Sequence, residues 1–221
     1  MWGVGELRLY AIGIDELRGM IGAEPAYAQR LQAIANRAFA PAHTEARGGL
    51  LSRLGPLFRR VPGAPVISPT DPEPRDAELL LSGAYVPHER VGAAWRVLET
   101  LTAGVAWSAT RMELTSQGLD DLDFALARGG VSAAVGLRHL LTCATSLGLL
   151  PVTGLTVGWH PYAKALAMAA AYRAAQGELK TAEQQGLIAA LVVWLDGFPA
   201  WAEAAAQLGR PRPDLIGFWA N

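Results

Sequence analysis

The sequence predicts a helix-dominated α+β fold, with about eight helices and a few short strands in one globular domain spanning residues 1–221. A chain of 221 residues can bury a single sizeable core. Hydrophobic residues make up 51% of the chain and charged residues only 18%, which excludes disorder caused by high polarity. Apolar residues recur mostly at helical spacing, and only short segments alternate between apolar and polar side chains as strands do.

The N-terminal segment predicts one strand followed by two helices. Residues 6–12 alternate apolar and polar side chains, which is typical of a half-buried strand. Asp15 is expected to cap a short helix that ends near Gly22. A second helix should begin near Pro25, because proline suits the first helical position, and should end near Pro41.

Residues 41–74 differ in composition and predict a long loop or internal linker rich in proline and arginine. Its five prolines between 62 and 74 are incompatible with a regular helix or a central strand. The first half surrounds leucines with arginines, which suits either a surface helix packed on the core or an element that docks a partner. The partner-binding candidates in this segment are Arg53, Arg59 and Arg60.

The rest of the chain predicts mainly helices. Helical patterns cover residues 76–82, 88–102, 116–128, 132–147, 162–176, 182–195 and 199–208, and extended segments are expected over 107–114 and 155–159. Thr181 and Gln184 have the spacing of a capping box at a helix start. The apolar tail 215–219 should dock on the body of the protein or on a partner.

Charge, cysteine content and hydropathy exclude several classes of protein. The net charge of −1 argues against a nucleic-acid binder, which needs clustered basic residues. Cys143 is the only cysteine, so no intramolecular disulfide forms and a reducing cytoplasm is compatible. No secretory signal is visible, and the longest apolar run, 187–195, is much shorter than the roughly 20 residues of a membrane span. We therefore expect a cytoplasmic protein without nucleic-acid or membrane contacts.

His139 and Cys143 lie four residues apart on a predicted helix and therefore share a face. This spacing suits a nucleophilic Cys–His pair or half of a metal site. Catalytic pairs normally converge from separate segments, however, and the surrounding leucines favour a core cysteine with a partly buried histidine. Asp120, Asp121 and Asp123 lack the spacing of a calcium loop and are expected to stabilise the N-terminal end of their own helix. The sequence thus predicts no metal and no cofactor.

Two helix starts gather polar and aromatic side chains that suit a ligand site. Such junctions lie in loops, where binding residues are common. The ligand-binding candidates are Tyr85, His88 and Arg90 at the first junction, and Trp159, His160, Tyr162 and Lys164 at the second. If the two junctions meet in the fold, they line one cleft.

Two segments resemble the YfbM-like family of uncharacterised bacterial proteins. The segment Glu6-Leu-Arg-Leu-Tyr-Ala-Ile-Gly-Ile-Asp-Glu-Leu17 is similar to the first strand and following helix of that family. The segment Leu81-Ser-Gly-Ala-Tyr-Val-Pro-His-Glu-Arg-Val91 is similar to its motif of small residues, an extended step to proline and an acidic helix start. The resemblance implies an α+β fold and assigns no catalytic residue.

Function is predicted from what the sequence lacks and from its tryptophans. It has no phosphate loop, nucleophile elbow, His-Glu-x-x-His motif or glycine-rich dinucleotide turn. It has seven tryptophans, a residue type enriched in interface hot spots, and Trp201 and Trp219 lie in C-terminal segments where full burial is hardest. These two are further partner-binding candidates. The prediction is a protein-binding module, such as an immunity protein that neutralises a toxin; the alternative is a small-molecule enzyme or ligand-binding protein that uses the cleft.

Overall fold

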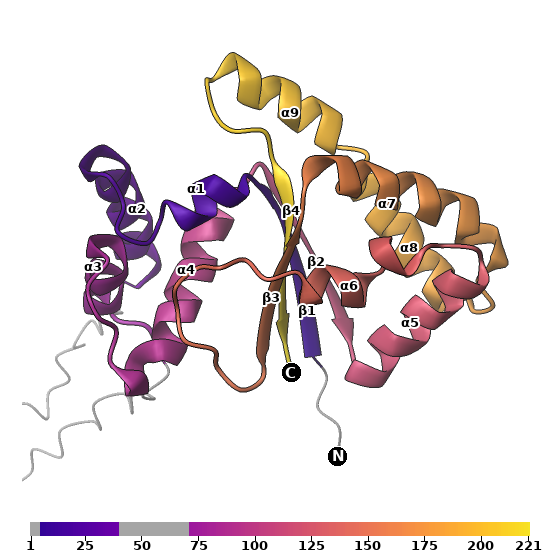
Figure 1. The fold of residues 1–221 in the computed structure, drawn as a ribbon, viewed down its shortest axis with the longest axis horizontal. Helices are drawn as coiled ribbons and strands as arrows, with labels where there is room; N and C mark the ends of the chain where they lie inside the picture. The colour runs from indigo at the N-terminus through magenta and orange to yellow at the C-terminus, as the bar shows by residue number, and fades with distance from the viewer. Residues whose placement is uncertain (1–4, 40–70) are drawn as a thin grey trace, which may run out of the picture.

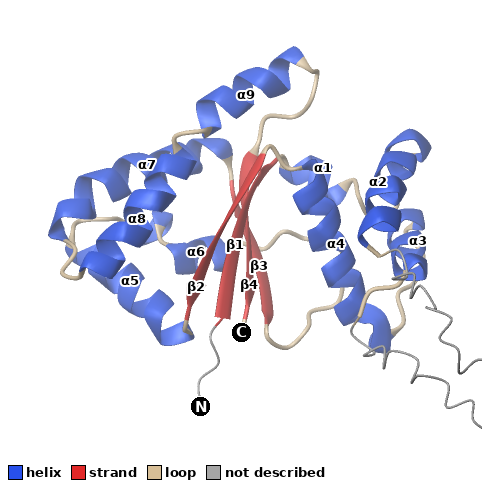
Figure 2. Ribbon diagram, turned by 180° about the vertical axis from the view of Figure 1, so that it is seen from behind, coloured by secondary structure: helices blue, strands red, loops and turns tan. Residues whose placement is uncertain are grey.

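The computed structural model describes residues 5–39 and 71–221 and has a four-stranded antiparallel sheet at its centre. In spatial order the sheet reads β2-β1-β4-β3, so the first and last strands of the described chain pair in the middle. The strands are β1 (Gly5–Ile12), β2 (Ser108–Leu114), β3 (Leu155–His160) and β4 (Asp214–Ala220). Helices cover both faces of the sheet (Figure 1 and Figure 2). The predicted helix-dominated α+β fold in one domain is confirmed.

Four helices form the layer on one face of the sheet (Figure 1). They are α1 (Ile14–Arg18), α2 (Pro25–Ala38), α3 (Pro74–Ser82) and α4 (Val91–Val105), and the short 3-10 helix η3 (His88–Arg90) leads into α4. The predicted apolar face of α4 is buried; it carries Val91, Trp95, Leu98 and Leu101. These side chains pack in one core with Tyr10, Ile12, Ile216 and Phe218 of the sheet.

The opposite face is covered by a second helical layer (Figure 2). It contains α5 (Ser116–Arg128), α6 (Leu137–Thr142), α7 (Tyr162–Ala175) and α8 (Ala182–Leu195), with the 3-10 helices η4 (Ala133–Val135) and η5 (Gln176–Glu178). The helix α9 (Phe198–Gln207) lies beyond the end of the sheet, before the chain returns as β4. Leu7 and Leu9 of β1 and Leu215 of β4 face this second core.

Strand β1 is buried on both faces over residues 9–12, whereas Glu6 and Arg8 stay partly exposed. Successive side chains of a strand point to opposite faces, so Leu9 and Tyr10 enter different cores. Tyr10 is only 5% exposed, and its hydroxyl donates to a carboxylate oxygen of Glu99 on α4. The prediction of a half-buried strand is therefore confirmed for residues 6–8 and wrong for residues 9–12, because the α1–α4 layer covers the second face there.

The apolar tail forms the central strand β4. It pairs with β1 on one side and with β3 on the other. Burial of the tail on the body of the protein is confirmed, and its uninterrupted apolar run is typical of a strand covered on both faces. At its start, the Asp214 carboxylate accepts hydrogen bonds from the backbone N–H groups of Ile14 (3.0 Å) and Tyr162 (2.9 Å), which begin helices in the two different layers.

Several predicted helix boundaries are confirmed and others change. Thr181 caps α8 through its side-chain oxygen, as the sequence predicts, and Thr115 caps α5 in the same way. Gly13, and not Asp15, precedes α1. Ser132 caps the short η4, and the predicted helix 132–147 is divided into η4, α6 and an irregular segment.

The predicted loop 41–74 falls largely outside the described residues, which resume at 71. Arg53, Arg59 and Arg60 lie in that part. At its end, Pro74 begins helix α3, so the exclusion of a helix there is wrong at this residue. Proline is tolerated at the first helical position because that N–H has no partner within the helix.

One helical stretch in the described part of the chain, Ala182–Gln207, is long and apolar enough to cross a membrane by length and composition alone. This is weak evidence, since an apolar core helix passes the same test. The stretch is divided into α8 and α9. The absence of a membrane contact stays a prediction.

Candidate metal centre

Helix α6 and the end of strand β3 bring three metal-ligating side chains together. His139 lies on α6, Cys143 directly follows α6, and His160 is the last residue of β3. Their candidate ligand atoms all lie within 4.8 Å of one another. We call these three residues the His–Cys–His cluster.

The close approach of α6 to β3 requires a glycine at position 158. A Cβ atom there would lie 2.0 Å from the carbonyl oxygen of Leu140, which is an impossible contact. Beside it, the Trp159 amide donates to the Cys143 carbonyl at 3.2 Å, and Ala144 pairs with Gly158 as an isolated β-bridge. Glycine within a strand often marks such an approach of another backbone. The backbone contacts thus fix the end of α6, and with it Cys143, against β3.

Helix α6 is held from its other end by an aspartate of α5. The Asp123 carboxylate accepts from the backbone N–H groups of Leu137 (2.8 Å) and Arg138 (2.7 Å), which are otherwise unpaired at a helix start. The Arg138 side chain donates to Asp120 at 2.6 Å. The prediction that these aspartates stabilise their own helix is wrong, because α5 begins at Ser116 and has no acidic residue in its first turn.

One distance within the cluster, between Cys143 Sγ and His139 Nδ1, matches that of a tetrahedral zinc site. Cys143 Sγ and His139 Nδ1 are 3.5 Å apart, and the ring centroids of His139 and His160 are 5.3 Å apart. Zinc binds sulfur at about 2.3 Å and imidazole nitrogen at about 2.1 Å, so two such ligands at the tetrahedral angle lie about 3.6 Å apart. The Cys143–His139 pair is thus already at coordinating separation, and all three ligand atoms, which lie within 4.8 Å of one another, must close in on an ion to about 3.6 Å.

His160 is the most deeply buried member of the cluster. It is 0% exposed, and within the described chain neither of its ring nitrogens has a hydrogen-bond partner. The Trp159 backbone lies close enough to favour the protonated ring without reaching hydrogen-bond geometry. Leaving a buried polar group unpaired costs about 1–3 kcal/mol. A bound metal ion would supply the missing partner.

The surroundings of His160 keep its ring neutral. Burial, followed by the positive charge of Lys164 and the nearby His139, lowers the pKa of His160 to about 4. A neutral imidazole has a free lone pair, which is the form that binds a metal. His139 and Cys143 are half-buried, so the cluster reaches solvent on their side.

The sequence contained two of the signals for this cluster but not their combination. The spacing of His139 and Cys143 predicts a shared helix face, but the surrounding leucines favour a core cysteine, and catalytic residues normally converge from separate segments. The structure provides a ligand from another segment in His160, seventeen residues beyond Cys143 in the chain. Gly158 within a predicted strand was the one further signal, because it indicates that another backbone approaches there. The expectation of no metal stays untested, and these three side chains form a candidate site.

The second predicted junction is divided between the two faces of the sheet. Trp159 points away from the cluster into the α1–α4 core, where its indole N–H donates to the Ala144 carbonyl and the Arg18 guanidinium lies 5.7 Å from its ring centroid. Tyr162 packs against the other core, under the guanidinium of Arg212 at 4.5 Å. Of the predicted residues at this junction, His160 is a member of the cluster, and Lys164 lies close enough to act on it through its charge.

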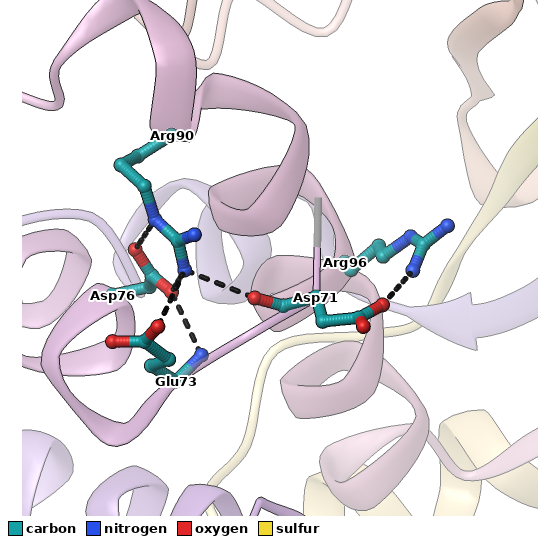
Figure 3. Close-up of polar contacts among 5 residues, drawn as sticks. All are labelled: Asp71, Glu73, Asp76, Arg90 and Arg96. Atoms are coloured by element: carbon teal, nitrogen blue, oxygen red, sulfur yellow. Dashed lines mark hydrogen bonds and ion pairs between the residues drawn. The ribbon is translucent and has the colours of Figure 1, made fainter. Parts of the chain in front are cut away.

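Residues of the first predicted junction do not join the cluster. Tyr85 is 78% exposed and His88 is exposed on η3. Figure 3 shows the guanidinium of Arg90 held by the buried carboxylate of Asp76, and Arg90 Nη2 also donates to the Asp71 carbonyl at 2.9 Å. Arg90 thus ties the start of α3 to the start of α4.

The cavities lined by residues of the first junction contain no residue of the second junction. The cavity at Tyr85 also contains Leu149 and Leu150, and the cavity at Arg90 is closed by residues of α3. None of the residues 159–164 lines either cavity. The predicted common cleft is therefore not formed around Tyr85 or Arg90.

The two tryptophans predicted to bind a partner contribute to the core. Trp219 is 2% exposed in β4, so its assignment to a partner surface is wrong; the second helical layer covers it. Trp201 is half-buried, with its ring 5.3 Å from that of Phe198 and 5.5 Å from that of Trp194. Protein binding stays a prediction, as does a cytoplasmic location.

Comparison with known proteins gives a family but no function. Residues 5–220 match the family model described as "Domain of unknown function (DUF7691)", so the chain belongs to that family. No curated protein and no solved structure matches the chain. The His–Cys–His cluster lies within the matched residues.

Proposed function

We propose that this protein is a zinc-binding protein that holds one zinc ion through His139, Cys143 and His160. The observation that carries the proposal is the fully buried His160: among the described residues its two ring nitrogens have no hydrogen-bond partner, and a cysteine and a second histidine lie beside it. Buried polar groups are almost always paired, and imidazole with thiolate is a typical zinc ligand set.

Zinc is supported over the hard cations by the donor atoms. Calcium and magnesium take oxygen ligands, whereas this cluster offers two nitrogens and one sulfur. The Sγ to Nδ1 separation of 3.5 Å agrees with tetrahedral coordination. A thiolate also neutralises one of the two charges of the ion, which lowers the cost of placing it next to a buried ring.

The test is the metal content of the purified protein after incubation with zinc and removal of excess ion. We expect about one zinc per chain by plasma mass spectrometry in the wild type, following the single cluster in the described residues. Cys143→Ala and His160→Ala should each lose most of the bound zinc. His88→Ala is the matched control, because it removes an exposed histidine that lies on η3 outside the cluster.

Two outcomes would contradict the proposal. One is a folded wild-type protein that retains no zinc; the other is a Cys143→Ala variant that retains the wild-type amount. Circular dichroism of each variant separates loss of ligand from loss of fold. Should His160→Ala not fold, Cys143→Ala decides the matter, since Cys143 is half-buried and its replacement removes only a sulfur atom.

A further inference from the structure

The His–Cys–His cluster has fewer protein ligands than a closed zinc site. Within residues 5–39 and 71–221, the group of close ligand atoms contains these three residues and no fourth histidine, cysteine or carboxylate. Structural zinc sites are closed by four protein ligands, whereas sites that act on other molecules have three protein ligands and one open position. Three ligands therefore leave one tetrahedral position for a molecule from solution.

The open position is accessible from solvent. His160 forms the buried side of the cluster, and the half-buried His139 and Cys143 form the side nearer to the surface. An ion coordinated by these three side chains would have the buried His160 ring on its inner side. Its remaining position would then face the side formed by the half-buried His139 and Cys143.

The charge near the cluster favours an anion. Lys164 lies on the first turn of α7, four residues after His160, and its positive charge acts on the His160 ring. Helix α7 begins two residues after His160, so the positive end of its dipole is also on this side. The neighbouring carboxylate of Asp214 is occupied by the N–H groups of Ile14 and Tyr162. Because the negative charge of Asp214 offsets the positive end of α7, the positive potential at this place would come from the zinc ion and Lys164.

We infer that the fourth position of this zinc binds a small anion from solution, such as a carboxylate, and that Lys164 helps to hold it. The inference rests on the proposed function, since it needs the metal to be bound. The anion would donate one lone pair to the metal, without any covalent or redox change. Lys164 acts here through its charge.

The experiment uses the full-length protein loaded with Co²⁺, whose visible spectrum reports on its ligands. We expect azide and acetate to change the spectrum with saturable binding. Lys164→Gln should weaken the binding of both anions about tenfold, since a positive charge near the bound anion is removed. Lys180→Gln is the matched control, because Lys180 is the other lysine of the chain and is exposed before α8.

The possible failures are distinguishable. A protein that takes up no Co²⁺ contradicts the proposed zinc site itself. A cobalt protein whose spectrum is unchanged by either anion has a closed site, which overturns the anion inference and leaves metal binding intact. Equal anion affinities of Lys164→Gln and Lys180→Gln would show that Lys164 has no part in it.

Discussion

Gly158 is the residue that allows the candidate metal centre to form. It has no side chain, so the Leu140 carbonyl can approach β3 to a position where any Cβ would overlap it at 2.0 Å. This approach brings Cys143 and His139 of the α6 segment to His160. A strand glycine, usually a weak point in a sheet, here sets the distance between two elements.

At this scale we predict that Gly158→Ala destabilises the protein by several kcal/mol and abolishes zinc binding. The added methyl group must displace backbone atoms of α6, and overpacking of this kind typically costs about 1–3 kcal/mol or more. Urea denaturation and zinc content measure the two effects.

The matched control is Gly186→Ala on α8, where a Cβ would meet nothing within 4 Å. Alanine is preferred to glycine in helices by about 1 kcal/mol, so this variant should be slightly more stable and bind zinc normally. A Gly158→Ala protein with wild-type stability and full zinc content would show that α6 does not approach β3 as described.

At the scale of elements, helix α4 is tied to strand β1 by one buried carboxylate. Glu99 accepts from the Tyr10 hydroxyl at 3.2 Å and pairs with Arg8 at 2.6 Å. Burial raises the pKa of Glu99 despite the opposing charge of Arg8. The charged carboxylate is therefore less favourable in the folded protein than in the unfolded chain.

This shift predicts a pH dependence of stability. A carboxyl group whose pKa is raised by folding contributes stability below its unfolded pKa, about 4.5, and that contribution is lost as the pH rises through its folded pKa. Glu99→Gln removes the titration. We expect the free energy of unfolding of Glu99→Gln, relative to wild type, to increase as the pH rises above about 4.5.

Urea denaturation of the two proteins between pH 4 and pH 7 measures this difference. The control is Glu203→Gln, which changes an exposed glutamate of α9. A difference between Glu99→Gln and wild type that is the same at every pH would contradict the raised pKa. The attraction to Arg8 acts only on the charged carboxylate, so it is already included in the direction of the Glu99 pKa shift.

At the scale of the whole molecule, the two ends of the described chain form the middle of the sheet. β4 pairs with β1 and β3 and contributes to both cores through Leu215 and Trp219 on one face and Ile216 and Phe218 on the other. Without β4, neither helical layer has a complete sheet surface on which to pack. The fold is therefore closed only when the last strand is in place.

We predict that deletion of residues 214–221 prevents folding, because it removes a strand buried on both faces. Deletion of Asn221 alone, which lies after β4, should leave the fold intact and is the control. Circular dichroism melting and limited proteolysis distinguish the two proteins. A cooperative melting transition in the longer deletion would contradict a central position for β4.

Local features of the sequence were sufficient to predict the helices and the fold class. Thr115 and Thr181 cap their helices through contacts within three residues, and the buried face of α4 follows from spacing along one helix. Such interactions depend on neighbours in the chain. They are therefore present in the order of the amino acids itself.

The arrangement of the sheet and the candidate metal centre required the three-dimensional structure. Strand partners are distant in the chain: Tyr10 pairs with Ile216, and its side chain is buried by a helix that begins at Val91. His139 and Cys143 indicated half of a site, but His160 joins them only because α6 packs on β3 across Gly158. Contacts between distant segments depend on which surfaces cover one another, and periodicity along the chain carries no information about that.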